Sequence, residues 1–379
     1  MVTKRARRWL TRAALVGSVV VSGTLAVSAW SLAGSISETL LEFPPRSTAV
    51  EVVAIDDDTV TLRAAASVSR PGRWALVGED AWVEVGPVVA TAAGTVTRQV
   101  IAVSGRPGGT MRIEAEAYGP DPGAMGIEFD ERIVAGSGGD HSVWTVEGTG
   151  TLWVVMVHDG DTGRTQALRA LETVVGMGLP AVVPAMLGAD GAPEGGRPGL
   201  GAAEWRDVEA AIGLALSLGA EEVVLMGWGT GASAALVTAR QSRHAPRVAA
   251  LVLEDPLLDP GSIAEARLRE DKVPGFLIGW SKAVAVFRFG IDWDRLDHLA
   301  VAADQTLPTL LIHGSANDRH PPAATEAYAA AAPEAVAFVV PGAGHGEAWN
   351  VDPDRYRATL EEFLAKVVVG RAQDDPESD

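Results

Sequence analysis

Hydrophobic positions along the chain are spaced in two different ways, with the change near residue 120. Between Ser47 and Tyr118 the apolar residues form short runs rich in Val, Ile and Thr, and turn sequences such as Pro-Gly and Gly-Gly separate them. Runs of this kind are typical of β-strands. We expect strands at Val50–Ile55, Thr59–Leu62, Ala81–Val85, Val96–Val103 and Met111–Ala117. Residues 47–120 are therefore predicted to be a small β-rich module, and its composition suggests no chemistry.

After about residue 125 the pattern alternates between strands and helices. Strands are predicted at Ile127–Val134, His141–Val146, Leu152–Val157, Ala181–Pro184, Val223–Met226, Val248–Leu253, Leu307–His313 and Val336–Val340. Helices are predicted at Arg164–Gly176, Glu204–Leu218, 230–237, Ala323–Ala331 and Pro353–Val369. This alternation implies an α/β domain over residues 125–368, with a mainly parallel sheet and helices on both faces. The first two strands are expected to form a hairpin, residues 255–300 a helical lid, and residues 369–379 an acidic disordered tail.

The N-terminal residues 1–37 combine a basic stub with an uncharged apolar run. The run from Ala13 to Ala33 has the ~20 residues that a helix needs to cross a bilayer. Five basic residues precede it, namely Lys4, Arg5, Arg7, Arg8 and Arg12. Because positive charge stays on the cytoplasmic side, we expect a single-pass anchor in the cell membrane with the body outside the cytoplasm. The alternative is a signal peptide cleaved near Val27-Ser28-Ala29, which would release a secreted protein.

Charge and cysteine content exclude several classes of function. The net charge is −18, and without the five N-terminal basic residues the rest carries −23. Such an acidic body argues against nucleic-acid binding, which needs a basic face. The chain has no cysteine, so disulfides, thiolate catalysis and Cys-ligated metals are excluded. The seven histidines show no metal-binding spacing, and we expect neither a metal nor a cofactor.

The stretch Glu222–His244 carries the most informative motif. An apolar strand ends at Gly227-Trp228-Gly229-Thr230-Gly231, and a small-residue helix follows. This is the architecture of a nucleophile elbow, G-x-S-x-G, in which the central side chain stands at the top of the sheet. Here the flanking glycines are present, but the central residue, Gly229, has no side chain. A dinucleotide-binding glycine motif is the competing interpretation, and the order of the surrounding elements favours it less.

Several segments together resemble the α/β-hydrolase family, and most of all its membrane-anchored members with a short β region before the hydrolase domain. The resemblance covers residues 125–368. Besides the elbow, the segments that carry it are Val154-Val155-Met156-Val157-His158, Glu204–Ala211, Phe289-Gly290-Ile291-Asp292-Trp293, Leu311-Ile312-His313-Gly314, Gly342-Ala343-Gly344-His345 and Ala348–Pro353.

The resemblance implies a nucleophile, an acid and a histidine in that chain order. Gly229 stands at the nucleophile position and His345 at the histidine position. The acid position, four residues after the histidine of the late His-Gly pair, holds Asn317, with Asp318 beside it as an alternative. Some members place the acid after the sixth strand, where the candidate is Asp255, next to Glu254.

The oxyanion region is altered as well. The family commonly has His-Gly after the third strand, but this chain has His158-Asp159. We expect the carboxylate to oppose the negative charge that develops in acyl transfer. Thr230 is expected to open the helix and offer its backbone N–H to the oxyanion. Ser233, one turn further along, is expected to pack inside rather than serve as a relocated nucleophile.

These losses predict a non-catalytic pseudo-hydrolase that binds a small ligand or a protein partner beneath the lid. The alternative is an active esterase-like or peptidase-like hydrolase with an unusual nucleophile, such as water activated by His345 and oriented by Asp318 or Asp255. A third hypothesis is that the β module mediates contacts at the cell surface.

Overall fold

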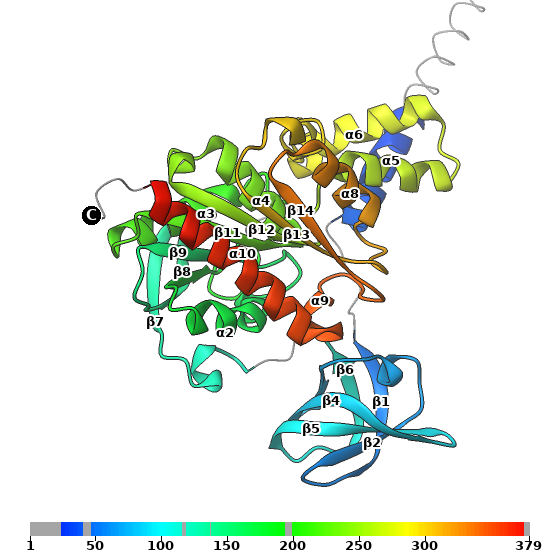
Figure 1. The fold of residues 1–379 in the computed structure, drawn as a ribbon. Coiled ribbons are helices and arrows are strands. Elements are labelled where there is room, and N and C mark those ends of the chain that lie inside the picture. Colours follow the sequence, from blue (N-terminus) through cyan, green and yellow to red (C-terminus); the bar gives the residue numbers. More distant parts are fainter. Residues whose placement is uncertain (1–23, 41–46, 116–118, 137, 194–198, 375–379) are drawn as a thin grey trace, which may run out of the picture. The chain divides into compact units, whose positions relative to one another are not determined.

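The computed structural model describes residues 24–40, 47–115, 119–136, 138–193 and 199–374 (Figure 1). The chain divides into two compact units. Unit 1 combines the N-terminal residues up to Phe43 with Pro260–Asp294, and unit 2 comprises Pro44–Asp259 and Arg295–Asp379.

The predicted β module of unit 2 is a closed antiparallel barrel (Figure 1). Its strands are β1 (Thr48–Ile55), β2 (Thr59–Arg63), β3 (Trp74–Val77), β4 (Ala81–Ala92), β5 (Thr95–Gly105) and β6 (Gly109–Glu114), in the order β1-β2-β5-β4-β3-β6. Inward-facing residues alternate along β2, where Val60 and Leu62 are buried. The sequence pattern missed β3, because four residues are too few to show alternation. That strand closes the barrel by pairing with both β4 and β6.

A buried arginine organises one end of this barrel. The guanidinium of Arg98 donates to four carbonyl oxygens, those of Gly86 (2.9 Å), Val68 (3.0 Å), Arg70 (2.7 Å) and Gly72 (2.7 Å). Burial, followed by the like charge of Arg70, lowers the pKa of Arg98 to about 10. The side chain therefore links the loop before β3 to the barrel wall. The acceptors of these four hydrogen bonds are all backbone carbonyls, and none is a carboxylate.

The larger sheet of unit 2 has eight strands in the order β14-β13-β12-β11-β9-β10-β8-β7. Their bounds are β7 Asp130–Gly136, β8 Gly139–Val146, β9 Leu152–Val157, β10 Ala181–Pro184, β11 Glu222–Trp228, β12 Val248–Glu254, β13 Thr309–Gly314 and β14 Ala335–Val340. Five neighbouring pairs run parallel. The predicted hairpin is confirmed as β7–β8, which adds to β10 in the antiparallel sense. The first strand begins at Asp130 rather than at Ile127.

Helices cover both faces of this sheet, as the alternation predicted (Figure 1). One core packs α2 (Leu168–Gly176) and α10 (Pro353–Asp374) against the strands. The other packs α3 (Trp205–Ser217), α4 (Gly229–Gln241) and α8 (Pro322–Ala331) on the opposite face. Helix α10 continues to Asp374, so the expectation of a disordered tail from residue 369 is wrong for residues 369–374. Residues 375–379 lie outside the described residues.

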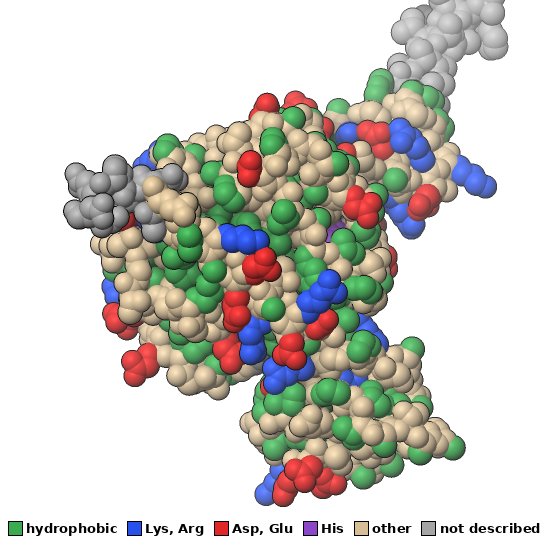
Figure 2. Space-filling view, viewed as in Figure 1, with side chains coloured by type: hydrophobic (Ala, Val, Ile, Leu, Met, Phe, Trp, Pro, Cys, Tyr) green, Lys and Arg blue, Asp and Glu red, His purple; other side chains and the backbone are tan. Residues whose placement is uncertain are grey.

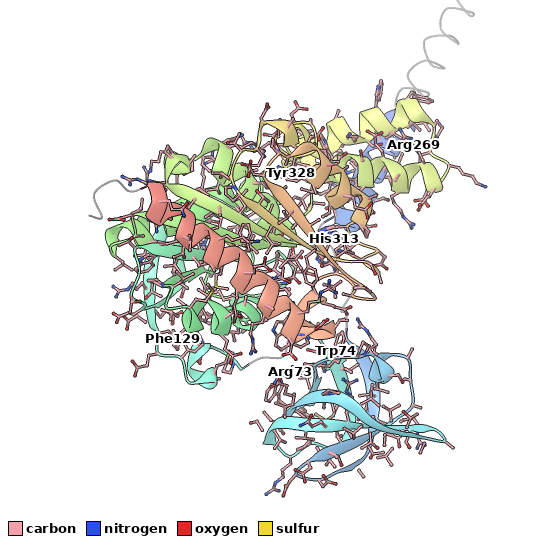
Figure 3. All side chains as sticks on the ribbon, in the orientation of Figure 1. Arg73, Trp74, Phe129, Arg269, His313 and Tyr328 are labelled. Carbon is pink, nitrogen blue, oxygen red and sulfur yellow. The ribbon has the colours of Figure 1, made fainter. Side chains whose placement is uncertain are left out.

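The loop that precedes α10 also holds the barrel. It contains the short helix α9 (Ala348–Val351). The Asn350 side chain donates to the carbonyls of Arg73 (labelled in Figure 3) and Ala115, both at 2.9 Å. The guanidinium of Arg70 pairs with the Glu347 carboxylate, with Nη1 at 2.9 Å from Oε1. Because Glu347 lies two residues after His345, the barrel is tied to the loop that carries this histidine.

Unit 1 is helical. Residues 24–40 form a helix. The segment predicted as the lid contributes two more helices, α5 (Pro260–Glu270) and α6 (Gly275–Phe289). Within this unit the guanidinium of Arg288 donates to the Trp30 carbonyl (3.1 Å) and lies 4.8 Å from the centre of the Trp30 ring. Within the described ranges, no helix has both the length and the apolar character required to cross a bilayer. Half of the predicted anchor, up to residue 23, lies outside these ranges.

Candidate active site

The nucleophile elbow predicted from the glycine pattern is present between β11 and α4. Gly229 has a φ of 52°, a left-handed conformation. A Cβ added to Gly227 would lie 2.6 Å from the Cα of Ala232, and one added to Gly231 would lie 2.3 Å from the carbonyl oxygen of Val157. Both flanking glycines are therefore required by close backbone packing, and the tight turn is intact although it presents no nucleophile.

The carboxylate of Asp159, which follows β9, fills the place of the missing nucleophile. A Cβ added to Gly229 would lie 2.1 Å from Asp159 Oδ2. The other oxygen, Oδ1, accepts hydrogen bonds from the Thr230 N–H (2.9 Å), the Thr230 hydroxyl (2.8 Å) and the Gly160 N–H (2.8 Å). In this turn the N–H after the nucleophile is an oxyanion donor. The sequence predicted that the carboxylate would repel an oxyanion; instead the carboxylate itself occupies the oxyanion position.

His345 joins Asp159 to Asn317, and the hydrogen bonds set its tautomer. The Asn317 Oδ1 accepts the N–H groups of Arg319 (3.0 Å) and His320 (2.9 Å), so its NH2 group faces His345 Nδ1 at 3.1 Å. An NH2 group only donates, which makes Nδ1 the acceptor and places the ring proton on Nε2. The Nε2–H group donates to Asp159 Oδ2, and the nitrogen and the oxygen are 2.8 Å apart. A catalytic triad needs the reverse, with a free lone pair on Nε2.

The site keeps Asp159 ionised although it is fully buried. Burial raises the pKa of Asp159, but the hydrogen bonds that it accepts from His345 and from the Thr230 N–H hold that pKa well below its usual range. A buried carboxylate with this many donors stays charged at neutral pH. Its two oxygens thereby take up the donors that a tetrahedral intermediate would use.

Arg319 lies beside this carboxylate. Its Nη1 is 4.0 Å from Asp159 Oδ2 and 2.7 Å from the Oδ2 of Asp161. Both aspartates come from the loop after β9. The guanidinium therefore links the loop after β13 to the loop that replaces the usual His-Gly segment.

The structure separates the three candidates for the acid. Asn317 is buried and contacts His345, whereas Asp318 is exposed, so the alternative of Asp318 as the orienting acid is wrong. Asp255 is buried and accepts the N–H groups of Gly314 (2.9 Å) and Gly346 (2.6 Å). Asp255 therefore holds the loops after β13 and β14 in place instead of orienting the His345 ring.

His313, labelled in Figure 3, belongs to the same support. Its Nδ1 is 3.4 Å from Asp255 Oδ1, and its Nε2 donates to the carbonyl of His320 at 2.9 Å. The His320 ring in turn meets the His345 ring edge-on, with centroids 4.5 Å apart. Packing of this kind fixes the plane of His345.

A buried acid–base pair lies beneath the elbow, and sequence reasoning did not find it. Glu254 accepts hydrogen bonds from Trp228 (2.7 Å) and from the Tyr356 hydroxyl (2.8 Å), and its Oε1 is 3.7 Å from Arg169 Nη1. Arg169 also donates to the Gly346 carbonyl. Burial raises the pKa of Glu254. The sequence pattern does not indicate that Arg169 is buried, because an arginine in an amphipathic helix normally lies on the surface.

His158 is structural. Its Nδ1 donates to the Asp159 carbonyl (2.7 Å), and its Nε2 accepts the N–H of Met186 (3.0 Å). Burial lowers the pKa of His158 to about 4, so the ring is neutral at physiological pH. Its two hydrogen bonds hold the loop that carries Asp159 in place.

Ser233 forms a serine–histidine pair that the sequence did not predict. Its hydroxyl lies 2.7 Å from His298 Nε2, while the Arg240 guanidinium donates to Nδ1 at 2.9 Å. Nε2 therefore carries the proton and donates to the serine. Burial and the charge of Arg240 hold the pKa of His298 well below its usual range. Ser233 is fully buried, as expected for a packing residue, and it has no base in this pair.

The part of the chain that the structure describes contains no cluster of three or more His, Asp or Glu residues able to hold a metal ion.

Comparison with known proteins supports the fold. Residues 51–114 match a family described as a domain of unknown function (DUF8805). No curated protein sequence matches the chain. Among solved structures, the esterase Pf2001 of Pyrococcus furiosus has a TM-score of 0.52 and 16% identity, over 66% of this chain and 95% of that one. A thermophilic esterase from Thermogutta terrifontis has a TM-score of 0.47 and 21% identity, over 63% and 99%. At these identities the similarity shows the fold alone. The larger sheet and its helices have an α/β-hydrolase fold.

Proposed function

We propose that this chain is a membrane-anchored α/β-hydrolase-fold protein that has lost hydrolytic activity and binds a small ligand or a protein partner outside the cytoplasm. The single observation that carries the proposal is the position of Asp159. Its carboxylate lies where the nucleophile side chain would begin, 2.1 Å from a Cβ on Gly229. The same carboxylate accepts the N–H of Thr230 at 2.9 Å.

The histidine supports the same conclusion. A general base must offer a lone pair to the proton that it removes. In His345 the lone pair lies on Nδ1 and accepts from Asn317, while Nε2 donates to Asp159. Both ring nitrogens are engaged, and neither is free to activate a hydroxyl or a water.

The anchoring and the location outside the cytoplasm rest on the sequence. The apolar run from Ala13 to Ala33 is long enough to cross a bilayer as a helix, and five basic residues flank it on the N-terminal side. Cleavage of the same segment as a signal peptide is the competing proposal. Detection of the intact N-terminus by mass spectrometry of the membrane fraction would separate the two.

Ester turnover tests the loss of activity. The purified protein, His345→Ala and His244→Ala would be assayed with p-nitrophenyl esters from acetate to octanoate. His244 is a half-buried histidine outside the site and serves as the matched control. We expect all three proteins to release p-nitrophenol at the rate of buffer alone. Turnover that is lost in His345→Ala and kept in His244→Ala would overturn the proposal.

The second candidate is an active hydrolase with a non-standard nucleophile, and one observation favours it. A carboxylate oxygen of Asp159 stands at the nucleophile position, 2.8 Å from His345 Nε2. Its attack on an acyl carbonyl would break the ester C–O bond, form a mixed anhydride and release an alkoxide, which would take a proton from water. Attack of water on the carboxyl carbon of Asp159 would then leave one water oxygen in that carboxylate. Turnover in 18O-water followed by peptide mass spectrometry would detect that oxygen, and its absence in a protein that turns over would exclude this route.

A further inference from the structure

A cleft lies between the outer wall of the barrel and the α/β domain, within unit 2. It has a volume of about 740 Å³, which is in the range of small-molecule pockets. Its lining includes Trp82, Glu84, Glu172, Trp349 and Arg357, and we call it the barrel cleft. The described residues that line it belong neither to the elbow nor to the loop after β9. It is therefore a second candidate site, distinct from the one around Asp159.

The barrel wall of this cleft presents an aromatic and an acidic side chain. Val83 of β4 is buried inside the barrel, so its neighbours Trp82 and Glu84 face outward. Their partners across the strand pair are Ser104 and Ala102 of β5, which also line the cleft. Because these partners are small, they leave room beside the indole and the carboxylate.

The facing wall carries a second tryptophan and a second carboxylate. Trp349 belongs to α9 and Glu172 to α2. Burial raises the pKa of Glu84, the charge of Arg73 lowers it, and the charge of Glu172 raises it. The carboxylates of the two walls are therefore close enough to repel each other. The guanidinium carbon of Arg73 lies 5.6 Å from the centre of the Trp349 ring, so aromatic and charged groups lie side by side.

The arginines that line the barrel cleft each face a carboxylate. Nε of Arg73 is 3.3 Å from Glu84 Oε1, and Nη2 of Arg357 is 3.5 Å from Glu172 Oε2. Arg169 faces the buried acid beneath the elbow. In Figure 2, basic and acidic side chains alternate over α10 and α2 towards the barrel. Positive and negative charges therefore balance within the protein.

This balance decides the class of ligand. A cationic ligand would have to compete with the arginines for the carboxylates, and an anionic ligand with the carboxylates for the arginines. A neutral ligand that carries hydroxyl groups does not face this competition. A hydroxyl group both donates and accepts, so it can bond to the carboxylate and to the guanidinium of the same pair.

We propose that the barrel cleft binds a neutral saccharide. A sugar ring presents apolar C–H groups on its faces, which can stack on Trp82, and hydroxyl groups at its edge, which can reach the pairs Arg73–Glu84 and Arg357–Glu172. The inference rests on the ligand-binding part of the proposed function. It does not depend on the loss of hydrolytic activity, because the cleft and the elbow are separate.

Saturation-transfer NMR of the full chain, held in phosphatidylcholine nanodiscs, tests the inference. The probes are neutral trisaccharides of glucose, mannose, galactose and N-acetylglucosamine. We expect transfer to the ring C–H protons of at least one of them. Its dissociation constant should rise by at least about tenfold in Trp82→Ala. Trp280→Ala removes a 55% exposed tryptophan of unit 1, outside the cleft, and should bind as the parent does.

Glu84→Gln is the second variant, because it keeps the shape of the side chain and tests the cleft even where Trp82→Ala fails to fold. It should weaken binding by about threefold, since a neutral acceptor forms weaker hydrogen bonds than a carboxylate. Absence of transfer to all four trisaccharides at millimolar concentration would overturn the inference. So would binding that Trp82→Ala and Glu84→Gln leave unchanged, since the sugar would then lie elsewhere.

Charged probes separate the failure of this inference from the failure of the proposed function. Trilysine and trigalacturonate would be titrated in the same way. Binding of either probe that is tighter than that of the trisaccharides and lost in Trp82→Ala would overturn the saccharide class while leaving a ligand site in the cleft. Ester turnover by the same samples reports separately on the loss of hydrolytic activity.

Discussion

The Oδ2 atom of Asp159 lies 2.8 Å from Nε2 of His345, at the point where a serine hydroxyl would meet the histidine of a hydrolase. The other oxygen of the same carboxylate occupies the oxyanion position through Thr230. One side chain thus satisfies the hydrogen-bonding groups that a reacting acyl group would use. The fold retains the geometry of the site, but the protein's own carboxylate occupies it.

The tautomer of His345 is the first prediction. Because Asn317 donates to Nδ1, the ring should carry a single proton on Nε2. In the 15N-labelled protein at pH 7.5, the two ring nitrogens should therefore give the widely separated shifts of the neutral Nε2–H tautomer. Asn317→Asp would replace the hydrogen-bond donor at Nδ1 by an acceptor and should therefore change the shift of Nδ1 more than that of Nε2. An Nδ1–H tautomer in the parent protein would contradict the orientation of Asn317.

Removing the charge of Asp159 should destabilise the protein. In Asp159→Asn the NH2 group would face the N–H of His345, or the hydrogen-bond acceptor would be lost at Thr230. We expect the free energy of unfolding, measured with urea, to fall by about 1–3 kcal/mol. Asp318→Asn, at the exposed neighbour of the acid position, should change it by less than about 0.5 kcal/mol. Equal effects of the two substitutions would show that the Asp159 contacts are not formed in solution.

The buried His298 should make stability fall on acidification. Its pKa is held well below 6.5 in the folded protein, so below pH 6.5 the unfolded chain takes up a proton that the folded chain does not. The contribution is therefore fully present above pH 6.5 and is lost as the pH falls below it. His298→Gln keeps a donor for Ser233 and an acceptor for Arg240. Between pH 6.5 and 5 its unfolding free energy should fall less steeply than that of the parent, by up to about 1.4 kcal/mol per pH unit. Identical slopes would show that folding does not lower the pKa of His298.

Arg98 should be irreplaceable in the barrel. Its guanidinium donates to four carbonyl oxygens, including those of Val68 and Gly72. A lysine has a single nitrogen and cannot reach all of them. We expect Arg98→Lys to lower the unfolding free energy by about 2–4 kcal/mol, because buried carbonyls lose their donors. Arg63→Lys, which changes an exposed pair with Glu51 on the same barrel, is the control and should change little. A near-neutral Arg98→Lys would contradict the four-carbonyl arrangement.

Local sequence patterns predicted the backbone scaffold of the site. The glycines at 227 and 231 predicted the elbow because only close backbone packing requires them, and counting from His313 placed Asn317 correctly. The orientation of Asp159 could not be predicted in this way. The sequence placed a carboxylate beside the oxyanion region, and electrostatics predicted repulsion. In the fold, the carboxylate turns into the space left by Gly229, because three donors around Oδ1 and His345 at Oδ2 stabilise it there.

Long-range pairs were also beyond the reach of local patterns. Arg169 and Glu254 meet beneath the elbow although 85 positions separate them, and no local pattern indicates that the two side chains are partners. The strand β3 was missed for a related reason: its place is set by pairing with β4 and β6 and not by its own four residues. What sequence predicted well was backbone geometry, and what it missed was the identity of partners across the fold.

Covalent labelling by a fluorophosphonate, followed by intact-mass measurement, tests the central claim most directly. The samples are the parent, Gly229→Ser, the triple variant Gly229→Ser/Asp159→Gly/Asn317→Asp, and a control triple variant with Gly229→Ala instead of Gly229→Ser. The account predicts one probe on the serine triple variant and none on the other three, because Asp159 excludes the nucleophile and the Asn317 amide sets the wrong tautomer. Labelling of the parent protein would contradict it.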